Sequence, residues 1–218
     1  MKRGLEFHAS PSRGSVDRFV ASLLQPAIRL AERRVARLIR EAGLELPAIT
    51  TTERVGYLHK TLRIQKFTTV NPATGEFIGR WARMLHTTGL DEMAQINNIL
   101  DGDMHFFGWR ALYDDPEGVH GPIEQGNLVH TYQGATAAMG SQSRAEFDMV
   151  IDGSKPGIFS SYSHFEHTAP RGTPISAERR AQMNVADYEA ASVAHDALIG
   201  VRHARVAARF AARALLHR

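Results

Sequence analysis

The C-terminal part of the sequence carries the pattern that most restricts its fold. Small and apolar residues recur there in alternating spacings of four and three, which is typical of a helix that packs along one seam. We expect this helix to extend over residues 173–218, with Thr173 and Pro174 at its start. Because alanine dominates the seam, another helix can approach it closely, either the N-terminal helix of the same chain or a second subunit. The seam consists of Ala190, Ala194, Ala197, Val201, Ala204, Ala208, Ala211 and Leu215.

A second helix is predicted over about residues 22–42. Pro26 suits its first turn, and Gly43 marks its end. Residues 1–14 show no apolar periodicity and are expected to form a flexible arm before a single domain over residues 15–218. The helix has an apolar face that we expect to be buried and a basic face, formed respectively by Ile28, Ala31, Val35, Leu38 and Ala42, and by Arg29, Arg33, Arg37 and Arg40.

The middle of the chain has short segments of the kind that form strands, separated by turn residues. Residues 54–70 alternate between apolar and polar side chains. Thr88 and Asp91 resemble a capping box in front of a short helix. The spacing predicts an α+β protein in which a central antiparallel sheet packs against long N-terminal and C-terminal helices, with residues 50–118 as a candidate insertion. Further strands are expected at residues 104–113, 127–134, 144–153 and 157–168.

The composition excludes several classes of protein. The chain has 218 residues, 43% of them hydrophobic, which is enough to bury a large core. It has no cysteine, so disulfides, thiolate catalysis and cysteine-bound zinc are excluded. No apolar run approaches the ~20 residues that cross a bilayer, and no secretory signal is present, so we expect no membrane partner. The net charge of +3 indicates no general affinity for nucleic acid.

One short segment holds three potential metal ligands in four positions: His164, Glu166 and His167. In an extended strand, His164 and Glu166 share one face while His167 points to the other. The two histidines then cannot bind one metal, and a third ligand would have to come from His130 or Glu146. The chain also lacks a P-loop, a nucleophile elbow and a zinc-protease helix. We therefore expect no catalytic residue, no bound metal and no cofactor.

The last predicted helix has a basic face formed by four arginines. No acidic residue occurs from position 200 to the end of the chain. These arginines either form a solvated face near the helix C-terminus or contact phosphates or a neighbouring subunit. No base-reading motif accompanies them, so any DNA contact would be nonspecific. They are Arg202, Arg205, Arg209 and Arg213.

Two motifs resemble those of a known family. Pro122, Glu124, Gln125, Gly126 and Leu128 resemble the P-x-D-T-G-x-L pattern of structural proteins at the head–tail junction of long-tailed bacteriophages. A second motif of that family, Y-A-x-Y-x-E-x-G-T, is similar to the segment that contains Tyr162, Phe165, Glu166, His167 and Thr168. The order of helix, turn motif, strand, second motif and final helix is also similar, over about half of the chain.

The resemblance implies a structural protein of the virion without catalysis. Such a tail-completion, tail-terminator or neck protein would form a homo-oligomeric ring and bind other virion proteins, with nonspecific DNA contact in its lumen. The alternative is an enzyme, either a metal-dependent hydrolase or a bacterial effector, that uses His130, His164, Glu166 and His167. A third reading is a nucleic-acid-associated protein that uses the terminal arginines.

Overall fold

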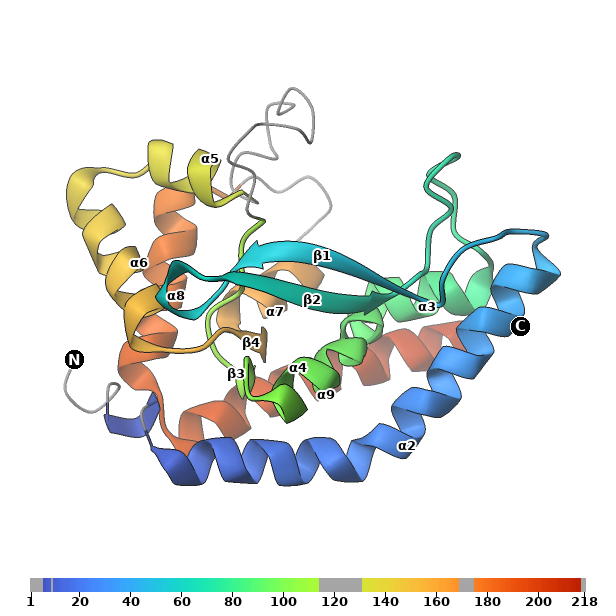
Figure 1. Cartoon of the computed structure of the whole chain (residues 1–218), viewed down its shortest axis with the longest axis horizontal. Coiled ribbons are helices and arrows are strands. Elements are labelled where there is room, and N and C mark those ends of the chain that lie inside the picture. The colour runs from blue at the N-terminus through green and yellow to red at the C-terminus, as the bar shows by residue number, and fades with distance from the viewer. Residues whose placement is uncertain (1–5, 9, 114–130, 169–174, 217–218) are drawn as a thin grey trace.

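A computed structural model describes residues 6–8, 10–113, 131–168 and 175–216 (Figure 1). Its mixture of helices and short strands confirms the α+β class, with long helices at both ends of the chain. In chain order the elements are α2 (Pro11–Glu41), β1 (Ile49–Val55), η1 (Tyr57–His59), β2 (Thr61–Phe67), α3 (Arg80–Thr88), η2 (Leu90–Gln95), α4 (Ile96–Asp101), β3 (His105–Phe107), α5 (Tyr132–Ala137), α6 (Ser141–Gly153), β4 (Gly157–Phe159), α7 (Ser161–Thr168), α8 (Ala177–Ala190) and α9 (Val193–Leu216).

The molecule is elongated along α2, which forms its lower edge in Figure 1. The β1–β2 hairpin crosses the middle, while α5, α6 and α8 gather at the end where α2 begins. The strand β3 pairs in parallel with β4, and β1 pairs antiparallel with β2. The antiparallel sheet that the sequence predicted is therefore a two-stranded hairpin, and helices supply most of the packing around it.

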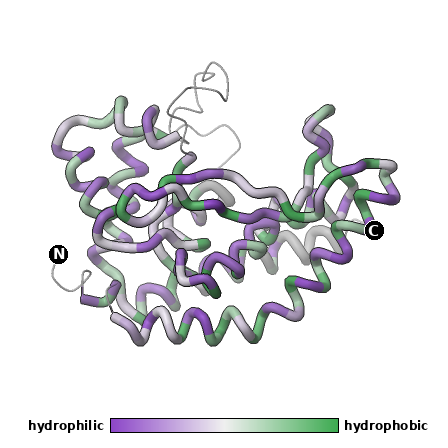
Figure 2. Tube along the Cα trace, in the orientation of Figure 1, coloured by the Kyte–Doolittle hydropathy of each residue, from purple (hydrophilic) through white to green (hydrophobic). Residues whose placement is uncertain are grey.

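The helix α2 begins at Pro11, inside the segment expected to be a flexible arm. Proline is favoured in a first helical turn, because the N–H that it lacks has no partner there. Pro26 lies inside the helix and not in its first turn, so the predicted start was wrong. The predicted apolar face is confirmed at Ile28 and Val35, which are buried, although Ala42 is exposed. Figure 2 shows how apolar and polar residues alternate along this helix.

Residues 54–70, predicted from alternation, contain the end of β1, a tight turn and the whole of β2. The register pairs Ile49 with Phe67 and Val55 with Thr61. The turn places Leu58 and His59 at φ 55°, a left-handed conformation that is uncommon for residues other than glycine. The helix expected after Thr88 exists, but the capping box was wrong, because the Thr88 hydroxyl donates to the carbonyls of Met84 and Leu85.

Two predicted strands are helical. Residues 144–153 lie in α6, where Phe147, Val150 and Ile151 are buried at the three- and four-residue spacing of a helix. Residues 157–168 form the short strand β4 and then the helix α7. Of the strand expected at residues 127–134, positions 127–130 lie outside the described residues, and Thr131 caps the helix α5 by accepting from the Gly134 N–H.

The C-terminal segment forms two helices, α8 and α9, and not one. Ser176 caps α8 by accepting from the Arg179 N–H, whereas Thr173 and Pro174 lie outside the described residues. Among the side chains of α9 that the structure describes, the buried ones are Ile199 and Val206, and the helix packs against α3 and α7. Large branched side chains remove more apolar surface from water than alanine does, so they face the core. The described seam residues Ala190, Ala194, Ala197, Val201, Ala204 and Ala208 are exposed, which contradicts intramolecular packing of the seam.

Two apolar clusters form the core and meet around β3 and β4. The first joins α2, the hairpin, α3 and α4, and it contains Ile28, Val35, Leu62, Ile64, Phe67, Leu85, Ile96 and Phe106 among others. The second joins α6 and α8 to the segment after β3. Residues 50–118, which we considered an insertion, contribute to both clusters. None of the helices that the structure describes is long and apolar enough to cross a membrane.

Candidate functional site

A buried glutamate with two cationic partners lies at the centre of the molecule. Arg110 donates from Nη1 to Oε2 of Glu92 at 2.7 Å and from Nη2 to Oε1 at 2.6 Å. The Nζ of Lys66 donates to Oε1 of the same carboxylate at 2.6 Å. Glu92 is 5% exposed, so water screens these interactions weakly. Paired arginine–carboxylate hydrogen bonds of this kind combine strength with a fixed geometry.

Three elements far apart in the sequence bring these side chains together. Lys66 lies near the end of β2, Glu92 lies on η2, and Arg110 follows β3. The segment η2 starts after Gly89, whose φ of 71° is a left-handed conformation that glycine adopts easily. The short helix therefore turns away from α3 and lies against β2, which places Glu92 beside Lys66.

The charge state of Glu92 depends on its two partners. Burial by itself would raise the pKa of the Glu92 carboxyl, because a charged group loses solvation in the protein interior. The charges of Arg110 and Lys66, together with their hydrogen bonds, outweigh this effect and hold the pKa well below its usual value. Glu92 is therefore an anion in this structure, and it stays one because of the two cations.

Arg54 is a third cation at this site. It is 5% exposed, and its guanidinium carbon lies 3.1 Å from the centre of the Tyr113 ring. Its Nη1 donates to the Ala111 carbonyl at 3.4 Å, and its Nε lies 3.5 Å from the Thr52 hydroxyl. Burial lowers the pKa of Arg54 to about 10, which still leaves it charged at neutral pH. Among the described residues, no carboxylate lies within ion-pair distance of Arg54.

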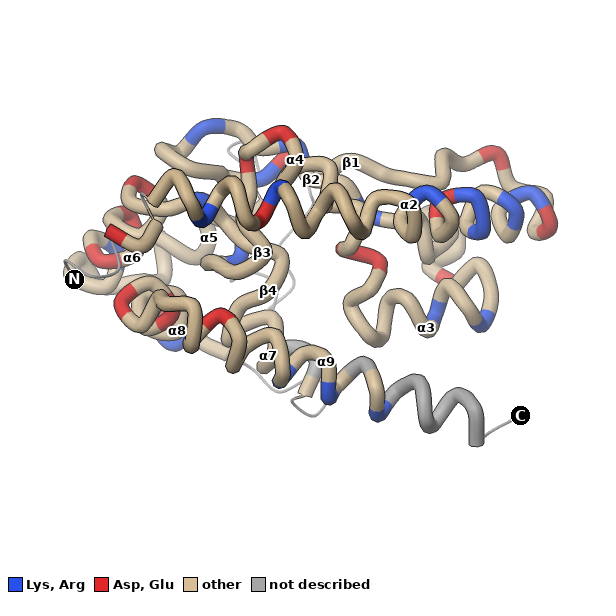
Figure 3. Tube along the Cα trace, turned by 90° about the horizontal axis from the view of Figure 1, so that it is seen from below, with Lys and Arg blue, Asp and Glu red and all other residues tan. Residues whose placement is uncertain are grey.

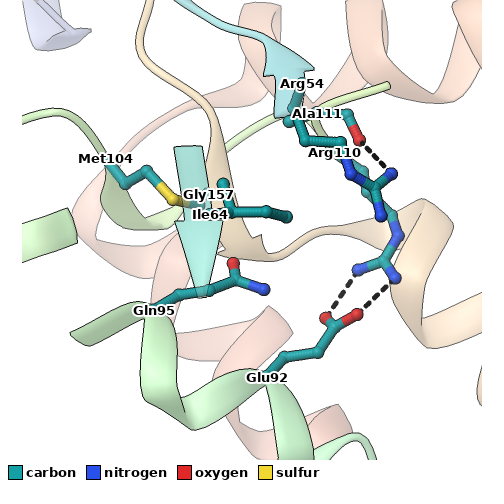
Figure 4. A pocket seen from close by; sticks show the side chains of 8 residues that line it. All are labelled: Arg54, Ile64, Glu92, Gln95, Met104, Arg110, Ala111 and Gly157. Carbon is teal, nitrogen blue, oxygen red and sulfur yellow. Dashed lines mark hydrogen bonds and ion pairs between the residues drawn. The ribbon is translucent and has the colours of Figure 1, made fainter. Parts of the chain in front are cut away.

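Arg54, Glu92 and Arg110 line one small pocket (Figure 4). In Figure 4 the guanidinium groups of Arg54 and Arg110 lie beside each other, and Arg110 points to Glu92. The empty space in and in front of the pocket is about 230 Å³, open solvent included, but the pocket itself has room for only about one water molecule. The other lining residues are Ile64, Gln95, Met104, Ala111 and Gly157. Among the described residues, the site is thus a narrow, cationic pocket lined by one carboxylate.

A close approach of two parallel chain segments holds Arg110 in place. Gly108 and Gly157 pass so close that a Cβ on Gly157 would lie 2.2 Å from the Gly108 nitrogen. Only glycine permits this approach. Two hydrogen bonds reinforce this close approach. The Trp109 indole donates to the Ser154 carbonyl at 3.0 Å, and the Gly157 N–H donates to the Trp109 carbonyl at 3.0 Å.

A second group of buried charges connects α2 to the same region. Arg13 donates to the Phe107 carbonyl at 2.5 Å and pairs with Asp196 of α9 at 3.2 Å. Asp17 lies 2.5 Å from Nδ1 of His105 on β3. The start of α2 is therefore held against β3, the strand that leads to Arg110.

Asp91 neighbours Glu92 on η2, but it points to another part of the molecule. Its Oδ2 lies 3.3 Å from Nδ1 of His86 on α3, and its side chain is 6% exposed. Successive residues of a 3₁₀-helix point about 120° apart, which accounts for the separate partners of Asp91 and Glu92. The two carboxylates thus end in different surroundings.

The predicted motif residues lie elsewhere. Pro122, Glu124, Gln125, Gly126, Leu128 and His130 lie outside the described residues. Tyr162 is buried in α7, where the Arg180 guanidinium lies 4.1 Å from the centre of its ring. The Thr168 hydroxyl donates to the His164 carbonyl at 2.8 Å, and the half-buried Phe165 lies on the same helix. These contacts are local to α7 or join it to α8.

The extended conformation assumed for the histidine-rich segment was wrong, because it forms α7. His164 lies with its ring centre 5.6 Å from that of His203 on α9. Glu166 and His167 are also on α7, but the structure does not describe their side chains. Glu146 accepts from Gln142 on the exposed face of α6 at 3.0 Å. Within the described part of the chain, no three histidine or acidic side chains gather as metal ligands.

The predicted arginine face is on α9. Arg202, Arg205 and Arg209 are exposed, and the Arg213 side chain is not described. Figure 3 shows basic residues along the second half of α2 and spaced along α9. None of the three exposed arginines lines the pocket around Glu92. A surface role for them stays a prediction.

The model of the bacterial sugar transferase family matches residues 13–209, which is nearly the whole chain. The chain belongs to this family. Comparison with curated proteins finds no similar sequence. The family match includes all the residues that line the pocket around Glu92.

Family membership overturns the functional predictions from the sequence. The resemblance to phage head–tail junction proteins was wrong, and so were the virion localisation and the absence of enzymatic function that it implied. The alternative of a metal-dependent hydrolase or effector has no support either, because the matching family is one of sugar transferases. A homo-oligomer and nonspecific DNA contact stay predictions.

Sequence reasoning missed Arg54, Lys66, Glu92 and Arg110 as a site. Each is an ordinary charged residue in a strand-like or helical segment, and Arg54 and Arg110 are 56 positions apart in the sequence. One signal was present: the acidic pair of Asp91 and Glu92 lies in a segment rich in apolar residues. Charged residues are rarely buried without partners, so such a pair in a core-forming segment indicates that cations lie nearby.

Proposed function

We propose that this protein is a sugar transferase and that the phosphate of its sugar donor binds in the pocket formed by Arg54, Glu92 and Arg110. The observation that carries the proposal is the surplus of positive charge around Glu92 among the described residues. In that part of the chain, three cations, Arg54, Lys66 and Arg110, lie around this carboxylate. Membership of the bacterial sugar transferase family supports a sugar as the transferred group.

The chemistry of these side chains suits a phosphate group. Arginine presents a planar set of donors that matches phosphate oxygens, and it is hydrated more weakly than lysine. When a sugar or a sugar phosphate leaves its donor, the remaining phosphate gains negative charge. Fixed guanidinium groups in a water-poor pocket stabilise this developing charge without needing to reorganise. Arg54 and Arg110 fulfil this role, since both lie on the pocket wall and both are held by neighbouring groups.

Glu92 is the acid–base candidate of the site. It is the carboxylate among the described residues that line the pocket, and Arg110 orients both of its oxygens. A carboxylate in this position can accept the proton of an acceptor hydroxyl or act as a nucleophile. Product analysis distinguishes these two roles, because only the second leaves a fragment of the donor attached to the protein.

The proposal is tested with nucleoside diphosphate sugars as donors and a bacterial membrane extract as the source of acceptor. Release of nucleotide is measured for the wild type and for Arg110→Ala. Removing one charge-stabilising donor from such a site costs about 100-fold or more in rate, so we expect the variant to lose turnover by at least that factor. The matched control is Arg63→Ala, because Arg63 pairs with Glu53 on the exposed side of the same hairpin. Equal turnover in both variants, or no release from any donor, would refute the proposal.

A further inference from the structure

We propose that Glu92 takes the place of the donor phosphate between Arg110 and Lys66 while the site is empty, and that an arriving phosphate displaces it. This inference rests on the proposed function, because it assumes that the pocket binds a phosphate. It adds that the pocket is self-blocked by its own carboxylate. The displaced Glu92 is then released from both cations at the moment when the donor is in place.

The geometry of the three side chains supports this exchange. Arg110 donates two hydrogen bonds to the two oxygens of Glu92, and Lys66 adds a third to Oε1. Two adjacent oxygens of a phosphate present the same pair of acceptors to a guanidinium. The carboxylate therefore satisfies the donors that a phosphate would need, and the two anions cannot use these donors simultaneously.

The size of the pocket gives a second, independent argument. It has room for about one water molecule, which is too little for a phosphate group. Glu92 and Arg110 are both on its wall, so opening their ion pair is the direct way to enlarge it. Arg54 lies on the same wall and has no carboxylate partner among the described residues, so it offers the first attachment point for an anion.

The segment that carries Glu92 is suited to such a movement. Glu92 is the third residue of η2, a single stretch of 3₁₀-helix between Gly89 and α4. Hydrogen bonds in a 3₁₀-helix have poorer geometry than those in an α-helix, and such stretches often mark hinges. Gly89, at φ 71°, separates η2 from α3, so η2 can shift while α3 stays in place.

The exchange has a consequence for protons. Once Arg110 and Lys66 hold a phosphate, Glu92 has lost the cations that keep it ionised, while it is still surrounded by protein. A buried carboxylate without a cation partner binds a proton more readily. When the anion binds alone, as pyrophosphate does, Glu92 takes this proton from solvent. During turnover the proton comes from the acceptor hydroxyl.

Titration calorimetry with inorganic pyrophosphate in metal-free buffer tests the exchange. We expect Glu92→Gln to bind pyrophosphate about tenfold more tightly than the wild type, because a neutral amide competes less well for a charged hydrogen bond. The matched control is Glu53→Gln, which removes an exposed carboxylate from β1 and should leave the affinity nearly unchanged. Equal or weaker binding by Glu92→Gln would overturn the inference.

Proton uptake gives a second readout. Pyrophosphate binding to the wild type and to Glu92→Gln is measured at one pH in buffers that differ in ionisation enthalpy. The protons that pyrophosphate itself exchanges cancel in the comparison, so we expect the wild type to take up close to one proton more than the variant. Equal proton uptake by the two proteins would overturn the displacement of Glu92. The two proposals fail differently. If pyrophosphate binds and Arg54→Ala weakens the binding, but Glu92→Gln does not tighten it, only the inference fails. If neither the wild type nor Glu92→Gln binds pyrophosphate, the phosphate pocket of the proposed function fails.

Discussion

The guanidinium carbon of Arg54 lies 3.1 Å from the centre of the Tyr113 ring, so within the described part of the chain a buried cation is held by an aromatic face and not by a carboxylate. The backbones of these residues also pair as an isolated antiparallel bridge. The end of β1 is thereby attached to the segment that follows Arg110. A cation held in this way keeps its charge available for an anionic ligand.

Arg54→Lys should weaken pyrophosphate binding about tenfold although the charge is kept. Lysine has no planar head group to stack on Tyr113 and no paired N–H donors. The variant therefore loses the fixed position of the cation and the paired hydrogen bonds to the anion. Titration calorimetry measures the effect. Arg63→Lys is the control, because Arg63 is exposed and far more weakly held by its pair with Glu53. Equal affinities of the two variants would show that Arg54 does not contact the anion.

Arg110→Ala should destabilise the fold by about 3 kcal/mol as well as abolish turnover. Removing one partner of a buried ion pair leaves the other charge poorly compensated, here with Lys66 as the remaining cation on Glu92. Urea unfolding measures the loss. An exposed pair is worth about 1 kcal/mol at most, so Arg63→Ala should change the stability little. A loss below about 1 kcal/mol in Arg110→Ala would mean that the pair is not formed in solution.

Gly157→Ala should be among the most damaging small substitutions in the chain. Its Cβ would lie 2.2 Å from the Gly108 nitrogen and 2.5 Å from the Phe107 carbonyl carbon, and neither backbone can yield without moving the segment that leads to Arg110. We expect a loss of roughly 3 kcal/mol, typical of a severe steric conflict in a core. The measurement is thermal or urea unfolding.

Gly14→Ala serves as the contrasting substitution for Gly157→Ala. Gly14 is inside α2, and the nearest atom to its Cβ would be the flexible end of Arg18 at 3.5 Å. Alanine is favoured over glycine in a helix by about 1 kcal/mol, so this variant should gain stability. If both variants changed the stability equally, the close approach of the backbones at Gly108 and Gly157 would be refuted.

Asp196 should give the stability an unusual dependence on pH. Burial, followed by the charges of Asp17 and Asp187, raises the pKa of its carboxyl from 3.8 to about 6, although Arg13 and His195 act in the opposite direction. The folded protein therefore holds a proton between about pH 4 and pH 6 that the unfolded chain has released. Binding of this proton stabilises the folded state as the pH falls through that window. The stabilisation is lost as the pH rises to about 6.

Asp196→Asn removes this dependence because asparagine does not titrate. The free energy of unfolding of the variant minus that of the wild type should be larger at pH 7 than at pH 4, by up to about 3 kcal/mol. His8 acts in the reverse sense, since burial lowers its pKa to about 3, but it is present in both proteins and largely cancels in the difference. Urea unfolding of the two proteins at several pH values measures this difference in the free energy of unfolding. Parallel curves for the two proteins would contradict the raised pKa.

The elements that sequence patterns predicted well are those whose local preference agrees with their surroundings. The apolar face of α2 at Ile28 and Val35 was predicted correctly because helical periodicity and burial coincide there. The patterns failed where the same residues suit both a strand and a helix. Phe147, Val150 and Ile151 suit a strand by composition, yet they pack into the core from the helix α6. The alanine seam of α9 looked like a packing surface, but among its described side chains Ile199 and Val206 are the buried ones.

The sequence by itself determined the α+β class, the helices at both ends, the lack of thiol chemistry and, through its family pattern, the sugar transferase assignment. Only the tertiary structure decided where the charges meet. Arg54, Lys66, Glu92 and Arg110 belong to four separate segments, and no local preference brings them together. They meet because the hairpin, η2 and the closely approaching segments at Gly108 and Gly157 pack on one core. An unpaired charge is costly in the low polarity of this interior, so the charges lie beside partners.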